Sequence, residues 1–170
     1  EGAEGDLTNK NSQTRIQQNI FGTFEFQFGK LGISTGINVN QTIYRYYDLL
    51  PEDIDHSDMK SYQWIFSPRF SLTYNLSDRL MLFSSLSHGF SAPSYEETLN
   101  ASGFVDGTIE PETGWNREIG IRGRYWNNRL FFKSSAYSIA VNDLLVTKRP
   151  AQDEFYKINA GKTMHNGLEA

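Results

Sequence analysis

The 170-residue sequence predicts an all-β fold, an antiparallel up-and-down meander that forms part of a transmembrane β-barrel. Three observations lead to this prediction. Long runs of the chain alternate between apolar and polar residues, these runs are longer than the strands of most soluble sheets, and the links between them alternate between short and long. Such a combination is typical of strands that face lipid on one side and water on the other.

The alternation is clearest in "SYQWIFSPRFSLTYNL", residues 61–76, where the even positions are mostly aromatic or aliphatic and the odd positions are mostly Ser, Arg, Thr and Asn. Because successive side chains of a strand point to opposite faces, this run has one apolar face and one polar face. Similar runs, some less regular, occupy residues 21–28, 31–43, 80–90, 116–125 and 130–145. We count about seven strands of roughly 10 to 16 residues, compared with ~5 to 6 residues in soluble sheets.

The links between the expected strands follow a second regularity. Short turns rich in Gly and Asn are expected near Gly29 and Lys30, across 75–79, and at Asn127 and Asn128. Long links are expected at residues 48–60, 91–115 and 146–154, with the leader 1–12 as a possible fourth. In a meander every second link lies at the same end, so all short turns gather at one rim, as in outer-membrane barrels. A soluble β-sandwich also alternates and remains the alternative.

Composition excludes several other classes of protein. The net charge of -4 and pI near 5.4 give no basic surface for nucleic acid. The chain has no cysteine, so it carries neither disulfides nor a thiolate metal site. No apolar run approaches the ~18 residues that a membrane-spanning helix requires. Strands are therefore the elements with which this chain could cross a membrane.

Four ordered segments resemble the barrel of TonB-dependent outer-membrane receptors. The first two are "LFSSLSHGFSAPSYEETL" (82–99) and "IEPETGWNREIGIRG" (109–123), and the other two are "AVNDLLV" (140–146) and "INAGKTMHNGLEA" (158–170). The residues that carry the match in the first two are Gly89, Phe90, Ala92, Pro93, Pro111, Glu112, Asn116, Glu118 and Gly120. The resemblance is specific for residues 62–170 and general for the first 60 residues.

The resemblance implies a localisation in the bacterial outer membrane and a role in transport. It implies energised uptake of a scarce ligand, with a ferric siderophore as the first expectation. The partners would be that ligand, outer-membrane lipid, and a plug domain that is driven through TonB. Because no plug is visible, we expect residues 1–170 to be a segment of a larger barrel, with the plug domain absent from this chain.

The same resemblance suggests two groups of site residues. Residues expected in extracellular loops that contact ligand are Tyr47, His56, His88 and Tyr95, and residues expected to face the lumen and the plug are Arg69, Glu118, Arg122 and Arg124. Haem receptors of the family hold a histidine in the loop that corresponds to residues 94–108, where this sequence has none. Because His88 lies just before that loop, haem stays open beside cobalamin and glycans. The alternative from another class is a soluble β-sheet module that binds carbohydrate.

Enzymatic chemistry finds little support in the sequence. The three histidines, His56, His88 and His165, show no metal-ligand spacing, and no nucleophile elbow or phosphate-binding glycine loop occurs. Adjacent Glu96 and Glu97 follow Pro93, which is expected to end a strand, and so are interpreted as a hydrated loop. We therefore expect no catalytic residues, no bound metal and no cofactor.

Overall fold

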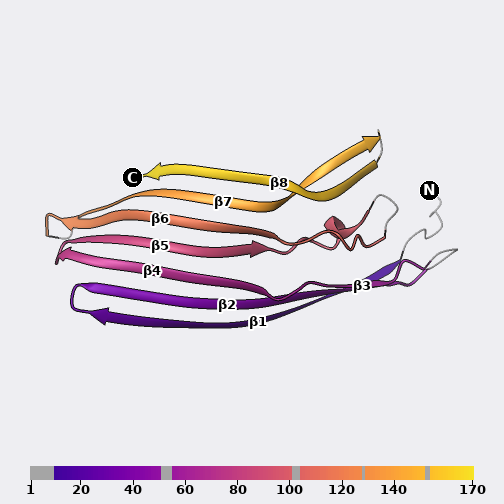
Figure 1. Cartoon of the computed structure of the whole chain (residues 1–170), viewed down its shortest axis with the longest axis horizontal. Helices are drawn as coiled ribbons and strands as arrows, with labels where there is room; N and C mark the ends of the chain where they lie inside the picture. The colour runs from indigo at the N-terminus through magenta and orange to yellow at the C-terminus, as the bar shows by residue number, and fades with distance from the viewer. Residues whose placement is uncertain (1–9, 51–54, 101–103, 128, 152–153) are drawn as a thin grey trace, which may run out of the picture.

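The computed structural model describes residues 10–50, 55–100, 104–127, 129–151 and 154–170. They form one antiparallel sheet in which seven long strands follow each other in chain order, with a short additional strand paired beside the second (Figure 1). The predicted all-β meander is confirmed. No helix among the described residues has the length and apolar character needed to cross a bilayer.

The elements have the following bounds: β1 Asn11–Phe28, β2 Leu31–Asp48, β3 Asp58–Ser61, β4 Ile65–Ser77, β5 Leu80–Ser91, the 3-10 helix η1 Glu96–Thr98, β6 Glu112–Tyr125, β7 Leu130–Ala151 and β8 Glu154–Glu169. Each long strand pairs with the next one along the chain, and β3 pairs with the end of β2. The outer two strands of this sheet are β1 and β8.

The ladder register sorts the side chains into two faces, since residues paired across an antiparallel ladder point to the same side. One face, called the apolar face here, carries exposed hydrophobic side chains, among them Phe24, Phe26 and Phe28 of β1, Phe66, Phe70, Leu72 and Tyr74 of β4, Leu82 and Leu86 of β5, Ile119 of β6, and Met164 and Leu168 of β8. The opposite side, called the polar face, contains the paired row Ser34, Ser71, Ser85 and Glu118.

No other layer of the described residues covers the apolar face. Phe24 and Phe70 are 63% and 42% exposed, and Leu168 is 85% exposed. Among the described residues the buried hydrophobic side chains are Tyr44, Tyr62, Tyr95 and Ile109, none of which lies on the apolar face. A contiguous apolar surface of this extent is unusual in soluble monomers and suits contact with lipid.

The two ends of the sheet differ as the sequence predicted. The short turns that follow β1, β4 and β6 lie together at one end, which Figure 1 shows at the left. Positive φ angles at Gly29 (57°), Trp126 (48°) and Asn127 (52°) allow two of these turns to be tight. The longer links between β2 and β4 and between β5 and β6 lie at the other end, called the loop end here. Asn128 lies outside the described residues.

All four predicted long links include residues that belong to strands. Residues 146–154 were expected to form a loop, but β7 continues to Ala151 and β8 begins at Glu154. Register shifts between Val141 and Leu145 break the alternation there, so the sequence pattern no longer marks the strand. The expected loop 91–115 ends earlier, because Glu112 already pairs with Ser91.

The other two expected links also contain strand residues. The expected link 48–60 includes most of β3, a strand too short to show periodicity. β1 already begins at Asn11, within the expected leader 1–12. Residues 1–9 of that leader and 51–54 of the link lie outside the described residues.

Candidate ligand-binding site at the loop end

Four tyrosines gather where the end of β2 meets the link between β5 and β6. Tyr44 and Tyr46 alternate along β2 and so share its polar face, together with Asn40 and Thr42. The ring of Tyr62 meets Tyr44 edge-on at 6.2 Å, and the ring of Tyr95 stacks on Tyr46 at 4.8 Å. We call these four residues the tyrosine cluster. Its packing holds the β5–β6 link over the polar face of the sheet.

The hydroxyl groups of the cluster are not equally satisfied. Tyr44 Oη donates a hydrogen bond of 2.6 Å to the carbonyl oxygen of the buried Pro93. The hydroxyls of Tyr62 and Tyr95 have no hydrogen-bond partner among the described residues, although these two residues are only 2% and 6% exposed. Burial raises the pKa of both phenols, so both stay protonated and can donate. An unpaired buried donor costs about 1 to 3 kcal/mol, which a hydrogen-bond acceptor placed here would recover.

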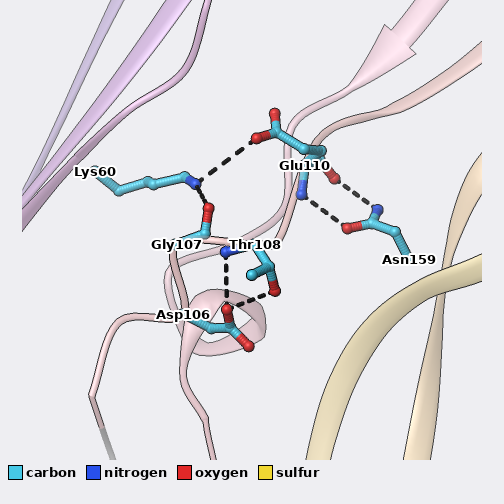
Figure 2. A network of polar contacts seen from close by, with 6 residues as sticks. All are labelled: Lys60, Asp106, Gly107, Thr108, Glu110 and Asn159. Carbon is cyan, nitrogen blue, oxygen red and sulfur yellow. Dashed lines mark hydrogen bonds and ion pairs between the residues drawn. The ribbon is translucent and has the colours of Figure 1, made fainter.

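A polar network fixes the β5–β6 link to its neighbours (Figure 2). Lys60 of β3 donates to the Gly107 carbonyl oxygen and lies 3.9 Å from the Glu110 carboxylate. Asp106 accepts hydrogen bonds from the Thr108 backbone N–H at 2.8 Å and from its hydroxyl at 2.6 Å. These bonds hold the pKa of Asp106 below its ordinary value. Lys60 thus connects the link to β3, and the Asp106 carboxylate stabilises the link internally.

Asn159 of β8 holds the other side of the link. Its Oδ1 accepts from the Glu110 backbone N–H at 2.8 Å, and its Nδ2 donates to the Glu110 carbonyl at 2.8 Å and to the Asp143 carbonyl at 2.7 Å. Asp143 has a positive φ of 57° at the irregular part of β7. Nearby, the Glu112 carboxylate accepts from the Leu145 N–H at 2.7 Å. These hydrogen bonds join residues of three family-like segments, 109–123, 140–146 and 158–170, and we call them the clamp around Asn159.

The adjacent acids after Pro93 have a local structural role. The Glu97 carboxylate accepts from the Ser94 N–H at 2.9 Å, while the Glu97 N–H donates to the Ser94 hydroxyl at 3.4 Å. Glu97 also lies 3.9 Å from Lys157 of β8. Glu97 thus shapes the turn around η1, and Glu96 is exposed as expected of a hydrated loop.

The four residues predicted to contact ligand are not brought together. Tyr95 lies in the tyrosine cluster, whereas Tyr47 alternates to the opposite face of β2 and is 51% exposed. The His56 ring lies 4.5 Å from the Phe104 ring and its Nδ1 lies 3.4 Å from the Asp48 carboxylate.

The fourth residue, His88, lies further along the sheet. Its ring is 5.0 Å from that of Trp115, and its Nδ1 is 3.4 Å from the Ser67 hydroxyl. Tyr44, Tyr46 and Tyr62 were missed by the sequence prediction, although the alternation of Tyr44 and Tyr46 with Arg45 and Tyr47 was a usable signal.

Two of the residues predicted to face the lumen line a polar groove of about 500 Å³. Arg69 and Glu118 lie in it, together with Asn38, Ser67, Ser85, Ser87, His88, Gly89, Phe90 and Asn116. The side-chain oxygens of Asn38 and Asn116 are buried there and have no hydrogen-bond partner in the part of the chain that the structure describes. The β4–β5 pairing ends at Arg69, next to Pro68, which has no N–H to continue the ladder. Where β4 and β5 separate, the groove therefore offers the oxygens of Asn38 and Asn116 as hydrogen-bond acceptors and the guanidinium of Arg69 as a cation.

The other two predicted lumen residues, Arg122 and Arg124, line a groove of about 530 Å³ at the short-turn end, with Arg79 and Lys133. Arg124 donates to the Asp78 carbonyl at 3.2 Å, and Lys133 pairs with Glu118 at 2.9 Å. Within the described part of the chain, no three His, Asp or Glu residues come close enough to hold a metal ion.

Comparison of the sequence with known protein families identifies one that matches. The profile of the family described as "TonB dependent receptor-like, beta-barrel" matches residues 2–170. No curated protein sequence matches the chain.

Solved structures share its fold at low sequence identity. The copper transporter OprC superposes with a TM-score of 0.74 at 17% identity, covering 92% of this chain and 25% of its own. The Serratia marcescens hemophore receptor HasR, in complex with its hemophore HasA and heme, gives 0.71 at 17% identity, covering 91% and 31%. The alcaligin outer-membrane receptor FauA of Bordetella pertussis gives 0.66 at 14% identity, covering 93% and 27%.

This chain spans about a quarter to a third of those proteins. The exposed apolar face, the difference between the two ends of the sheet and the family match over residues 2–170 all indicate an outer-membrane β-barrel. The chain belongs to the β-barrel of the TonB-dependent receptors, outer-membrane transport proteins of Gram-negative bacteria.

Proposed function

We propose that this chain is a segment of an importer that captures a ferric siderophore at its loop end and passes it through the barrel lumen. The plug domain lies outside residues 1–170 in this proposal, and TonB supplies the energy through it. Short turns of outer-membrane barrels face the periplasm, so the loop end faces the outside. Membership of an outer-membrane barrel family replaces the alternative of a soluble carbohydrate-binding module.

The observation that carries the proposal is the pair of buried, unpartnered donors at Tyr62 and Tyr95. Siderophores surround their iron with oxygen atoms, and these oxygens are hydrogen-bond acceptors with partial or full negative charge. A phenol that is held protonated by burial is a suitable donor to such an oxygen. The stacked ring of Tyr46 adds an apolar surface beside the donors. The site binds and releases its ligand, and the proposal includes no chemical step.

The two grooves of the polar face fit contact with the plug. The polar groove offers the unpaired oxygens of Asn38 and Asn116, which suit N–H donors of another segment. The groove at the short-turn end offers Arg79, Arg122 and Arg124, which suit carboxylates. We therefore propose that Arg69, Glu118, Arg122 and Arg124 contact the plug and leave ligand capture to the loop end.

Haem is the second candidate ligand, and a specific contact favours it. The side chain of His56 is 33% exposed at the loop end and its ring lies against Phe104 of the β5–β6 link. An imidazole beside an aromatic ring is a reasonable axial ligand for haem iron. Cobalamin and glycans remain open, but no contact among the described residues favours them over a siderophore.

The proposal is tested with Tyr62→Phe and Tyr95→Phe in the full-length receptor. Each change removes one hydroxyl and keeps the ring, so barrel assembly should be unchanged while affinity for the ferric siderophore falls about tenfold per lost bond. The matched control is Tyr74→Phe on the apolar face, which should leave binding unchanged. Growth under iron limitation, with single hydroxamate or catecholate siderophores as the iron source, identifies the ligand class.

Histidine variants separate the two ligand candidates. If the ligand is a siderophore, His56→Ala and His88→Ala should leave uptake largely intact. Growth on haem that is abolished by either substitution would reverse the preference. Unchanged binding of every ligand by both tyrosine variants would remove the tyrosine cluster from the proposal.

A further inference from the structure

Arg117 is a charged residue on the apolar face, within the lipid band. Arg117 of β6 pairs with Leu86 of β5 on one side and with Ser138 of β7 on the other, and Ser138 pairs with Asn166 of β8. These four residues form one row on the same side as Ile119, which is 64% exposed. A guanidinium, a hydroxyl and a carboxamide thus lie next to each other on the surface that faces lipid.

No acidic side chain among the described residues pairs with Arg117 to explain its position. It is exposed, and within the described residues its side chain forms no hydrogen bond or ion pair. The hydrophobic residues around it, Leu86 and Ile119, are exposed as well, so the guanidinium stands in an apolar surrounding. A cation in such a place is stabilised only by water or by an anion supplied from outside the chain.

The depth of Arg117 can be estimated from β6 itself. Tyr125 lies on the same face near the short-turn end and fits the inner aromatic girdle. The strand between Arg117 and Tyr125 rises roughly 20 Å along the membrane normal, given ~3.3 Å per residue and a tilt of ~40°. The apolar band of such barrels is about 25 Å tall. Arg117 therefore lies just below the outer boundary, within reach of the headgroups of the outer leaflet.

We propose that Arg117, Ser138 and Asn166 bind the phosphate of a lipid in the outer leaflet. The guanidinium supplies a charge-assisted, two-pronged contact with phosphate oxygens, and the hydroxyl and carboxamide supply neutral donors beside it. The acyl chains would lie against exposed apolar side chains nearby. Leu86 belongs to this row, and Ile119 and Leu168 lie nearer the short-turn end. The occupant is a lipid because a free phosphate would have no contact with that apolar surface.

A second cation extends the site towards the loop end. Lys162 of β8 is exposed and precedes Met164, which is 65% exposed on the apolar face. Its ammonium has no hydrogen bond or ion pair within the described residues. A lipid with two phosphates could use both cations, whereas a lipid with one would use Arg117.

The test measures lipid binding by the full-length receptor in a neutral detergent, by native mass spectrometry with lipid A and with dephosphorylated lipid A as probes. The wild type should bind lipid A more tightly than its dephosphorylated form. Arg117→Gln should weaken lipid A binding about tenfold, as expected for loss of a charged hydrogen bond, and leave the dephosphorylated lipid unaffected. Arg117→Lys should retain part of the preference.

Arg45→Gln is the matched control. Arg45 is an exposed cation of β2 that points to the same side as the apolar face, beyond the lipid band at the loop end. It should not change lipid binding. Because Arg117→Gln removes a charge from an apolar surrounding, it should assemble normally, which heat-modifiable electrophoretic mobility checks. Equal binding of both lipids by the wild type, an unchanged preference in Arg117→Gln, or an equal loss in Arg45→Gln would overturn the site.

Discussion

Phe70 and Ser71 are neighbours in β4, but they meet different surroundings. Phe70 is 42% exposed on the apolar face, whereas Ser71 pairs with Ser34 and Ser85 on the polar face. In the full-length receptor, Phe70→Arg should lower the amount of folded barrel, because a charge on the lipid-facing side has a cost that rises with depth, to about 2 to 4 kcal/mol at the middle of the lipid band. Ser71→Arg should assemble at near normal levels, since the cation keeps its water. The measurement is the fraction of heat-modifiable receptor in outer membranes.

Phe70→Leu is the control for this pair. Lipid imposes no shape on a side chain, so the smaller apolar residue should assemble well. A packed protein core would instead lose about 1 to 3 kcal/mol from the missing aromatic volume. Equal defects in Phe70→Leu and Phe70→Arg would count decisively against a lipid-facing position.

Asn159 tests the clamp on the β5–β6 link. Asn159→Ala removes three hydrogen bonds to Glu110 and Asp143 and should lower the free energy of local opening by about 1 to 2 kcal/mol, since water partly replaces them. Hydrogen exchange of residues 104–111 should therefore speed up, while exchange in β4 and β5 stays unchanged. Asn19→Ala, an exposed residue of β1, is the control. Unchanged exchange in the link would mean that the tyrosine cluster alone holds it.

Within the β5–β6 link, Asp106 makes the packing of a whole element depend on pH. Hydrogen bonds from Thr108 hold the Asp106 pKa below its ordinary value, with the nearby Lys60 as a smaller cause. The carboxylate therefore stabilises the folded link fully above the unfolded pKa of about 4, and this contribution disappears as pH falls through the lowered folded pKa. Cleavage of the link by pepsin in the full-length receptor should increase steeply in that acid range.

Thr108→Val is the informative variant for this pH dependence. It removes the hydroxyl bond and keeps the backbone bond, so the Asp106 pKa should rise towards its ordinary value. Cleavage should then begin at a higher pH than in the wild type. Superimposable pH profiles would show that Asp106 does not control the link.

The long strands could be predicted because each of their faces meets one solvent along its whole length. β4 and β6 alternate along most of their length, and the sequence places their short-turn ends within one residue, whereas their predicted starts at residues 61 and 116 each differ by four residues from Ile65 and Glu112. The end of β7 could not be predicted, since the positive φ at Asp143 and the nearby register shifts change which residues share a face. β3 was missed because its four residues are too few for a periodic signal.

The candidate site was predicted less well than the fold. Tyr95 was identified from its place in a family-like loop, but its contacts with Tyr46 depend on how a link of irregular backbone folds back over β2. No local pattern encodes such a contact. The clamp around Asn159 was visible only as a motif, and the structure assigns its hydrogen bonds.

For the whole molecule, the central claim is that this sheet is a wall of an outer-membrane barrel, with lipid on one side and a hydrated lumen on the other. The chain contains no cysteine, so single cysteines along residues 66–74 of the full-length receptor can each carry a spin label within this segment. Oxygen, which dissolves in lipid, and a water-soluble nickel chelate then report the surroundings of each label.

The account predicts two accessibility profiles of period two and opposite phase in reconstituted receptor. Oxygen should reach Phe66, Phe70, Leu72 and Tyr74, and the nickel chelate should reach Ser67, Arg69, Ser71 and Thr73. Profiles without this alternation, or with the phase reversed, would contradict the account.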